Sequence, residues 1–199
     1  ARVDRNHVVT QLVEDAARLL DELGHDVVAV DPGWADPDLP AHFVHVIQAT
    51  SALYPPADPA HYEPVNRMLA EEGRNTSAID YVRSILWLQA FSRRVVAGWD
   101  DFDVLLTPTL PMPTPPAGWI LHQEDPFMQL ALAAAAVAFT AIANITGQPA
   151  MSVPTYWADG VPIGVQLIGS PAGEEPLLRL ARQIEAARPW SDRRPSFAA

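Results

Sequence analysis

The sequence predicts an α/β fold, because helical apolar spacing alternates along the chain with short apolar runs. Apolar residues recur at helical intervals from Val9 to Leu23, and "DVVAV" follows Gly24 as an expected buried strand. "FDVLLTP" is a second apolar run, bounded by proline and typical of a strand buried on both faces. "AMSVP" and "IGVQLIG" flank Asp159-Gly160, the dipeptide of a two-residue hairpin turn. At 199 residues the chain is long enough to form one domain, residues 1–199, with a sizeable core.

Three further helices are expected before "FDVLLTP". The first follows Asp36 and Asp38, and the second ends at Gly73. Thr76 and Ser77 cap the third, which ends near Trp99. The apolar residues that indicate the first two helices are Leu39, Phe43, Val46, Ile47, Tyr62, Val65, Met68 and Leu69. In the third helix, the apolar residues expected to face inward are Ile79, Val82, Ile85, Leu86 and Val96.

The second half of the chain begins with a proline-rich loop. Prolines 108, 111, 113, 115 and 116 prevent ladder hydrogen bonds, so this stretch must leave the sheet and run extended. Asp125 and Pro126 then begin an alanine-rich helix over residues 127–143, which falls short of the roughly 20 apolar residues of a membrane span, so we expect a buried helix. A final helix runs from about Glu174 to Ala187. Its expected inward residues are Leu177, Leu178, Ala181 and Ile184.

Charge and cysteine content limit the classes of partner. The formal net charge is −11, and all thirteen basic residues are arginine, because the chain has no lysine. An acidic chain without a basic stripe repels phosphate backbones and anionic headgroups, so we expect no nucleic acid and no membrane as partners. Without cysteine there is no disulfide, thiolate metal site or cysteine nucleophile. The N-terminal residues lack the layout of a signal peptide, which predicts a cytoplasmic protein.

Four side chains could carry chemistry of their own. Ser170 lies where a strand passes toward a helix, but the flanking glycine spacing of a nucleophile elbow is wrong, which favours an ordinary turn serine. Ser152 lies inside a strand, where a hydroxyl bonded to neighbouring backbone is the favoured interpretation. His42 and His45 share a helical face, with His61 or Asp58 as a third metal ligand. A partly exposed histidine pair without metal is favoured, and no metal or cofactor is expected.

The order of several motifs resembles the C-terminal half of an amidase signature enzyme. These motifs are "FDVLLTPTLPMPTPPAG", "FTAIANITGQPAMSVP", "GVPIGVQLIG" and "EEPLLRLARQIEAARPW", and the opening "LVEDAARLLDELGHDVVAVDP" is similar to the helix and strand after that family's catalytic core. The resemblance covers nearly the whole chain. It implies a mixed β-sheet flanked by helices and the hydrolysis of a carboxylic amide to acid and amine.

The resemblance also implies that the catalytic residues lie outside this sequence. The family uses a serine nucleophile, a second serine held by a cis peptide, and a neutral lysine base, with backbone N–H groups of a Gly/Ser-rich loop stabilising the oxyanion. Here there is no lysine and nothing resembling a Gly-Gly-Ser-Ser run. We therefore expect no catalytic residue in this chain, an absent catalytic N-terminal half, and no activity of the chain alone.

The resemblance leaves a substrate-pocket role for this chain. Carried onto this sequence, it points to Phe139, Thr140 and Asn144, with Pro108 and Thr109 as a second group. Phe139 could instead be core, and Asn144 could only cap its own helix. The expected partners are a small-molecule amide substrate and the N-terminal half of the same protein, with self-association of the isolated segment. A non-catalytic binding or scaffold module, and an independent hydrolase using these His or Ser residues, remain the alternatives.

Overall fold

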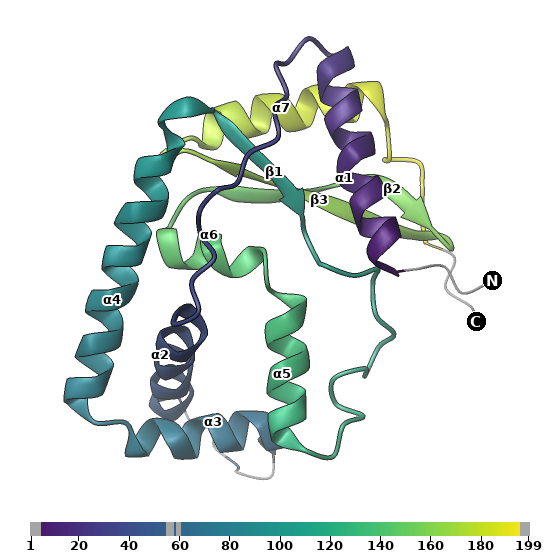
Figure 1. Ribbon diagram of the computed structural model, residues 1–199. Coiled ribbons are helices and arrows are strands. Elements are labelled where there is room, and N and C mark those ends of the chain that lie inside the picture. Colours follow the sequence, from purple (N-terminus) through teal and green to yellow (C-terminus); the bar gives the residue numbers. More distant parts are fainter. Residues whose placement is uncertain (1–4, 55–57, 59–60, 196–199) are drawn as a thin grey trace. The chain divides into compact units, whose positions relative to one another are not determined.

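The computed structural model describes residues 5–54, 58 and 61–195 (Figure 1). Contacts divide the chain into two compact units: unit 1 comprises Ala1–Pro32, Gly98–Ala117 and Ala135–Ala199, and unit 2 comprises Gly33–Ala97 and Gly118–Ala134. In chain order the elements are α1 (Arg5–Glu22), α2 (Leu39–Leu53), α3 (Pro64–Asn75), α4 (Ala78–Ala97), the 3-10 helix η2 (Gly98–Asp101), β1 (Val104–Pro108), α5 (Pro126–Ala136), α6 (Thr140–Thr146), β2 (Ala150–Ala158), β3 (Val161–Gly169) and α7 (Glu174–Ala187). The α/β class predicted from the sequence is confirmed.

Unit 1 contains a three-stranded antiparallel sheet with the order β1-β3-β2. β3 therefore lies between the two other strands, and Gln166 stands opposite both Thr107 of β1 and Ser152 of β2. β1 alternates buried and half-buried residues instead of being buried on both faces. This difference follows from its position: among the described strands β1 pairs on one side only.

The hairpin between β2 and β3 forms as predicted. Asp159 and Gly160 both have positive φ, +51° and +76°, which is the conformation of a type I′ turn. The register shifts once, between Val153 and Tyr156, where Pro154 cannot donate to the ladder. The turn chemistry predicted from two residues therefore joins two strands of nine residues each, which form seven cross-strand pairs.

Helices α1 and α7 cover one face of this sheet, and α6 lies on the other side (Figure 1). Both covering helices place apolar stripes against the strands, and α7 has the bounds predicted for it. Leu178 is exposed, so its predicted inward orientation is wrong, because Leu177 and Ile184 define the buried stripe of α7. The buried residues of this core are Leu12, Ala16, Leu19, Leu20, Val153, Ile163, Val165, Leu167, Leu177 and Ile184.

The predicted strand "DVVAV", residues 26–30, does not form. Residues 25–32 carry neither helix nor strand, and Val28 is 62% exposed. Val27 and Val30 are exposed as well. A strand exists only through hydrogen bonds to a neighbour, and no strand in the described part of the chain pairs with this run. The prediction from apolar composition is wrong here, because composition does not supply a pairing partner.

Unit 2 contains α2, α3 and α4. The sequence predicted that Gly73 ends its helix, but Gly73 lies inside α3. A Cβ atom on Gly73 would lie less than 3.0 Å from the carbonyl oxygen of Gln48 in α2. The glycine therefore permits two helices to approach closely, and α3 continues for two residues beyond it.

The buried face of α4 also differs from the prediction. Ile79, Val82 and Leu86 are exposed, whereas Ser84, Phe91 and Val95 are buried. The helix carries apolar residues on more than one face, so periodicity alone could not select the face that packs inside unit 2. α2 itself has no buried residue, and its predicted apolar side is half-buried.

The alanine-rich segment forms two helices instead of one buried helix. α5 ends at Ala136 and α6 begins at Thr140. Phe127 and Met128 of α5 are exposed, so that helix is not buried as expected. Within residues 5–54, 58 and 61–195, no single helix is long and apolar enough to cross a membrane. Only α5 and α6 taken together reach that length and composition, and they are two helices separated by a sharp bend.

Candidate functional site

A row of polar side chains crosses all three strands of unit 1 on the sheet face opposite to α1 and α7. Thr107, Gln166 and Ser152 stand side by side in register, one from each strand. Successive side chains of a strand point to opposite faces. The flanking residues Val165 and Val153 therefore point to the apolar core, while this row points toward the side on which α6 lies (Figure 1).

Gln166 is the centre of this row. Its amide nitrogen donates to the Thr107 hydroxyl at 3.1 Å and to the backbone carbonyl of Phe139 at 3.2 Å. The Thr107 hydroxyl in turn donates to the Pro108 carbonyl at 3.0 Å. Gln166 is only 4% exposed, and an unpaired amide at such burial is costly. Both amide protons have an acceptor, so the network joins β1, β3 and the start of α6.

An exposed pair of hydroxyl groups lies beside this buried network. Thr109 Oγ1 and Ser152 Oγ are 2.7 Å apart. Gly164 of β3 makes room for them, because a Cβ atom there would lie less than 3.0 Å from Ser152 Oγ. The Thr109 backbone N–H also donates to the Gly164 carbonyl at 3.3 Å. The residue that follows β1 is thus still attached to the sheet.

Of the predicted pocket residues, Pro108 and Phe139 take part in the Gln166 network, each through its backbone carbonyl, whereas Thr140 and Asn144 do not. Pro108 ends β1 and Thr109 follows it, while Phe139 precedes α6 and supplies the carbonyl that Gln166 binds. Thr140 is half-buried and donates its hydroxyl to the Val137 carbonyl at 3.3 Å. Asn144 lies inside α6 with an exposed side chain. The sequence analysis missed Gln166, although one glutamine in the apolar run "IGVQLIG" was a usable signal.

The Gly-Gln-Pro sequence between α6 and β2 has a structural explanation. Gly147 ends α6 with a left-handed φ of +72° and donates its N–H to the Ala143 carbonyl. Gln148 is buried and donates its amide to the Gly169 carbonyl at 2.8 Å. Gly169 in turn donates its N–H to the Pro149 carbonyl at 2.9 Å. This connection attaches the exit of α6 to the end of β3.

Ser152 and Ser170, the two serines considered as nucleophiles, differ in how far the structure agrees with the prediction. The Ser152 hydroxyl bonds to Thr109, a side chain, and not to the backbone as expected. The Ser170 carbonyl accepts the Gly173 N–H at 2.9 Å in the turn before α7, and Ala172 has a positive φ of +60°. Ser170 therefore lies in a tight turn at a helix entry, as the sequence indicated.

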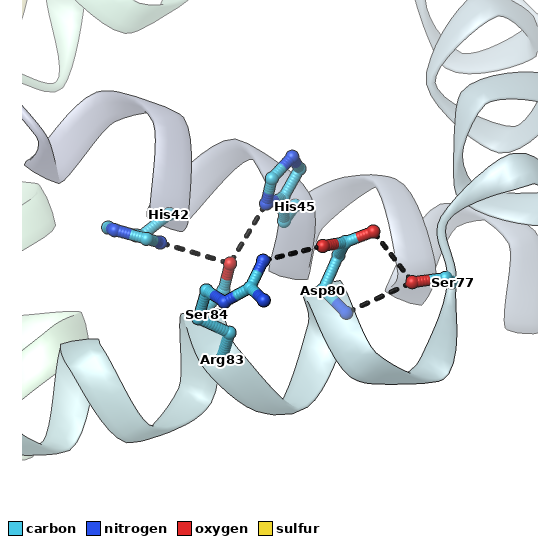
Figure 2. Close-up of polar contacts among 6 residues, drawn as sticks. All are labelled: His42, His45, Ser77, Asp80, Arg83 and Ser84. Atoms are coloured by element: carbon cyan, nitrogen blue, oxygen red, sulfur yellow. Dashed lines mark hydrogen bonds and ion pairs between the residues drawn. The ribbon is translucent and has the colours of Figure 1, made fainter.

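The histidine pair of unit 2 lies on one helical face, as predicted, but its partner is a serine. Figure 2 shows His42 and His45 of α2 directed toward Ser84 of α4, with Nδ1 to Oγ distances of 3.1 and 2.8 Å. His42 also stacks on Trp87, with ring centroids 4.5 Å apart. Within the residues that the structure describes, no group of three or more His, Asp or Glu is arranged to hold a metal.

The Ser84 hydroxyl does not have the geometry of an independent hydrolase. Ser84 is 1% exposed, so a carbonyl substrate cannot reach its oxygen. A serine hydroxyl has one proton to donate. At most one imidazole can accept that proton, so at least one ring donates its own Nδ1 proton to the serine oxygen. The three side chains form a cross-link between α2 and α4.

A nearby carboxylate shows the clearest electrostatic perturbation of the described residues. Arg94 donates to Asp36 at 2.8 Å, and the backbone N–H of Asp38 donates to the same carboxyl group at 3.1 Å. The arginine hydrogen bond, followed by the backbone one, lowers the pKa of Asp36 from its ordinary value of 3.8. This ion pair attaches the loop before α2 to α4.

The family model described as Amidase matches residues 2–178 of this chain. The chain therefore belongs to the amidase family, and the family predicted from the sequence is confirmed.

Similar proteins carry the name of this class. AmiB2 of Mycobacterium tuberculosis, a protein assigned as an amidase, is 36% identical over 196 residues, which cover 94% of this chain and 40% of AmiB2. An amidase of Pseudomonas putida is 30% identical, covering 95% of this chain and 41% of its own length. The present chain thus spans about 40% of the length of these curated relatives, consistent with a C-terminal half of an amidase.

Solved structures agree with this assignment. The structure of 6-aminohexanoate cyclic dimer hydrolase has a TM-score of 0.83 and 25% identity, covering 94% of this chain and 42% of that one. A bacterial aryl acylamidase of the amidase signature family has a TM-score of 0.73 at 24% identity, covering 92% of this chain and 41% of its own. The second likeness supports the fold alone.

Proposed function

We propose that this chain is the pocket-forming C-terminal segment of an amidase that hydrolyses a carboxylic amide to an acid and an amine. The observation that carries the proposal is the family match over residues 2–178, together with the 40% share of its relatives that the chain spans. The named relatives and neighbours are amide hydrolases or are assigned as such, which supports the reaction type. The substrate itself depends on pocket residues from the whole enzyme.

The chemical step in this proposal uses groups outside the chain. A serine oxygen attacks the amide carbonyl and forms an ester with the acyl carbon, while the C–N bond breaks and the amine leaves with a proton. Water then hydrolyses the ester, which releases the acid and regenerates the serine. A second serine and a neutral lysine move the protons. This sequence has no lysine, so the other part of the protein supplies the base.

The contribution of this chain is a wall of the substrate pocket. Phe139, Thr140 and Asn144 form one part of this wall, and Pro108 and Thr109 form the other. An apolar surface with few polar groups is what ligand sites commonly offer. The Thr109 and Ser152 hydroxyls, 2.7 Å apart, supply such polar groups at the residue that follows Pro108.

The partner in this proposal is the N-terminal half of the same protein. Exposed apolar groups support it in each unit separately: Val27, Val28 and Val30 in unit 1, and Ile79 and Leu86 in unit 2. Such groups favour burial against further protein surface. β1 and β2 each pair on one side only within the described sheet, and unpaired strand edges favour further strands.

The activity of the chain alone tests this proposal. We expect the purified 199-residue chain to release no amine from small aryl amides at neutral pH above background, because it has no lysine base. Co-expression with the N-terminal half is expected to restore turnover. Turnover by the chain alone that disappears in Ser152→Ala or Ser170→Ala would contradict the proposal.

The alternative is a non-catalytic binding or scaffold module with the same fold. The absence of lysine is the observation that favours it. The encoded sequence before Ala1 distinguishes the two: a lysine and a Gly/Ser-rich run in the same reading frame support the amidase, and their absence supports the binding module.

A further inference from the structure

We infer that Gln166 is a positioning residue for the substrate wall, acting by holding the start of α6 at a set distance from the end of β1. This inference rests on the proposed function, because the wall is part of that proposal. Gln166 is only 4% exposed, so it offers almost no surface of its own to a substrate. It acts through the two groups to which its amide donates.

The two hydrogen bonds of Gln166 end next to the two halves of the wall. One acceptor is the hydroxyl of Thr107, whose neighbours along the chain are Pro108 and Thr109. The other acceptor is the carbonyl of Phe139, directly before Thr140. One amide nitrogen therefore bridges segments that are 32 residues apart in the chain, residues 107 and 139. The spacing of the wall depends on this bridge.

Burial makes the bridge specific for an amide. Both acceptors need a proton donor, and a carboxylate at position 166 would place a negative charge against the Phe139 carbonyl. The Thr107 hydroxyl, by contrast, can rotate and donate to a carboxylate. Gln166→Glu therefore breaks the contact to α6 and keeps the contact to β1. Thr107→Val has the opposite effect. These two variants separate the two halves of the bridge.

The loss of the bridge should change the selectivity among acyl groups more than the rate of the chemical step. A loosened wall binds the substrate in more positions, which weakens ground-state and transition-state binding together and raises KM. A misplacement of about 1 Å near a reacting group can lower the rate by about 100-fold. Because Gln166 acts on the wall indirectly, we expect its loss to raise KM about tenfold, to change kcat less, and to reduce the preference among acyl groups of different size.

The experiment compares Gln166→Leu, Gln166→Glu and Thr107→Val in the complete enzyme, with Gln129→Leu as the matched control. Gln129 is also buried and donates its amide to a backbone carbonyl, that of Gln123, within unit 2. A series of aryl amides with acyl groups of increasing length supplies kcat and KM. We expect the Gln166 variants to change the ratio of KM values along the series, and Gln129→Leu to lower the melting temperature without changing that ratio.

A second measurement keeps the inference testable when a variant folds poorly or the enzyme lacks activity on these amides. Backbone hydrogen exchange of residues 140–146, measured in the complete protein, should be faster in Gln166→Glu than in Thr107→Val and Gln129→Leu. Equal exchange in the three variants, or KM ratios unchanged in the Gln166 variants, would overturn the inference. Wild-type enzyme without activity on any amide would overturn the proposed function, while the exchange result would still decide whether Gln166 positions α6.

Discussion

At the scale of single residues, the polar side chains of this protein act mainly by joining helices and strands. Ser84 joins α2 to α4, and Gln166 joins the strands to α6. The spacing of His42 and His45 placed both rings on one face correctly. Their partner, Ser84, lies 42 residues from His42 and 39 residues from His45 in the sequence, so local periodicity could not identify it.

The first residue-scale prediction concerns Ser84. Ser84→Ala removes the shared partner of two imidazoles, and an unsatisfied part-buried polar group costs about 1–3 kcal/mol. We expect a loss of that size in urea unfolding. Nitrogen chemical shifts of the wild-type rings should show at least one histidine protonated at Nδ1. Both rings in the Nε2-protonated form would contradict the arrangement in Figure 2.

The second residue-scale prediction concerns pH. The pKa of Asp36 is lower in the folded chain than its ordinary value of 3.8, so its ion pair stabilises the fold above that pH. This contribution is lost as the pH falls through the folded pKa. We expect Arg94→Gln to lower the free energy of unfolding at neutral pH, and the difference from wild type to shrink below pH 3.8.

The control for that experiment is Arg179→Gln. Arg179 pairs with Glu175 on the exposed surface of α7, where solvent weakens the interaction. We expect this variant to unfold like the wild type at both pH values. A difference between wild type and Arg94→Gln that stays constant down to the most acidic pH would contradict the role assigned to Asp36.

At the scale of elements, the predictions that succeeded depended on neighbours in sequence. The I′ turn at Asp159 and Gly160, and the bounds of α7, follow from local chemistry alone. The predictions that failed depended on distant partners. Residues 26–30 have the composition of a strand but no strand to pair with, and α4 selects its buried face through contacts with α2.

The element-scale prediction concerns Gly73. Alanine in a helix is intrinsically better than glycine by about 1 kcal/mol. Here a Cβ atom would lie less than 3.0 Å from the Gln48 carbonyl, and overpacking of this kind costs about 1–3 kcal/mol or more. Steric conflict with rigid backbone should dominate, so we expect Gly73→Ala to lower the melting temperature.

The matched control is Gly98→Ala, since nothing lies within 4 Å of a Cβ atom at that position. We expect that variant to melt at or slightly above the wild-type temperature. If Gly73→Ala were as stable as Gly98→Ala, the close approach of α2 and α3 would be wrong, and Gly73 would be an ordinary helix residue.

At the scale of the whole molecule, the family could be predicted because its motifs are ordered along nearly the entire chain. The candidate wall residues came from the same resemblance, but the buried amide that joins them did not, because hydrogen bonds between β3 and α6 are not visible in a linear pattern. Exposed apolar residues such as Val28 and Ile79 are where local patterns failed, because both were predicted to be buried. The chain spans about 40% of the length of its curated relative AmiB2.

The whole-molecule prediction follows from those uncovered positions. When the chain is alone, its exposed apolar groups and its two sheet edges should associate with those of other copies of the chain. We expect the isolated chain to sediment as oligomers, to bind a hydrophobic dye more strongly than a complete domain of its size, and to become soluble on co-expression with the N-terminal half. Val28→Glu, at an exposed position outside helices and strands, should reduce both association and dye binding. A monodisperse monomer that binds no dye would instead support the self-contained binding module, because such a surface would need no further protein to cover it.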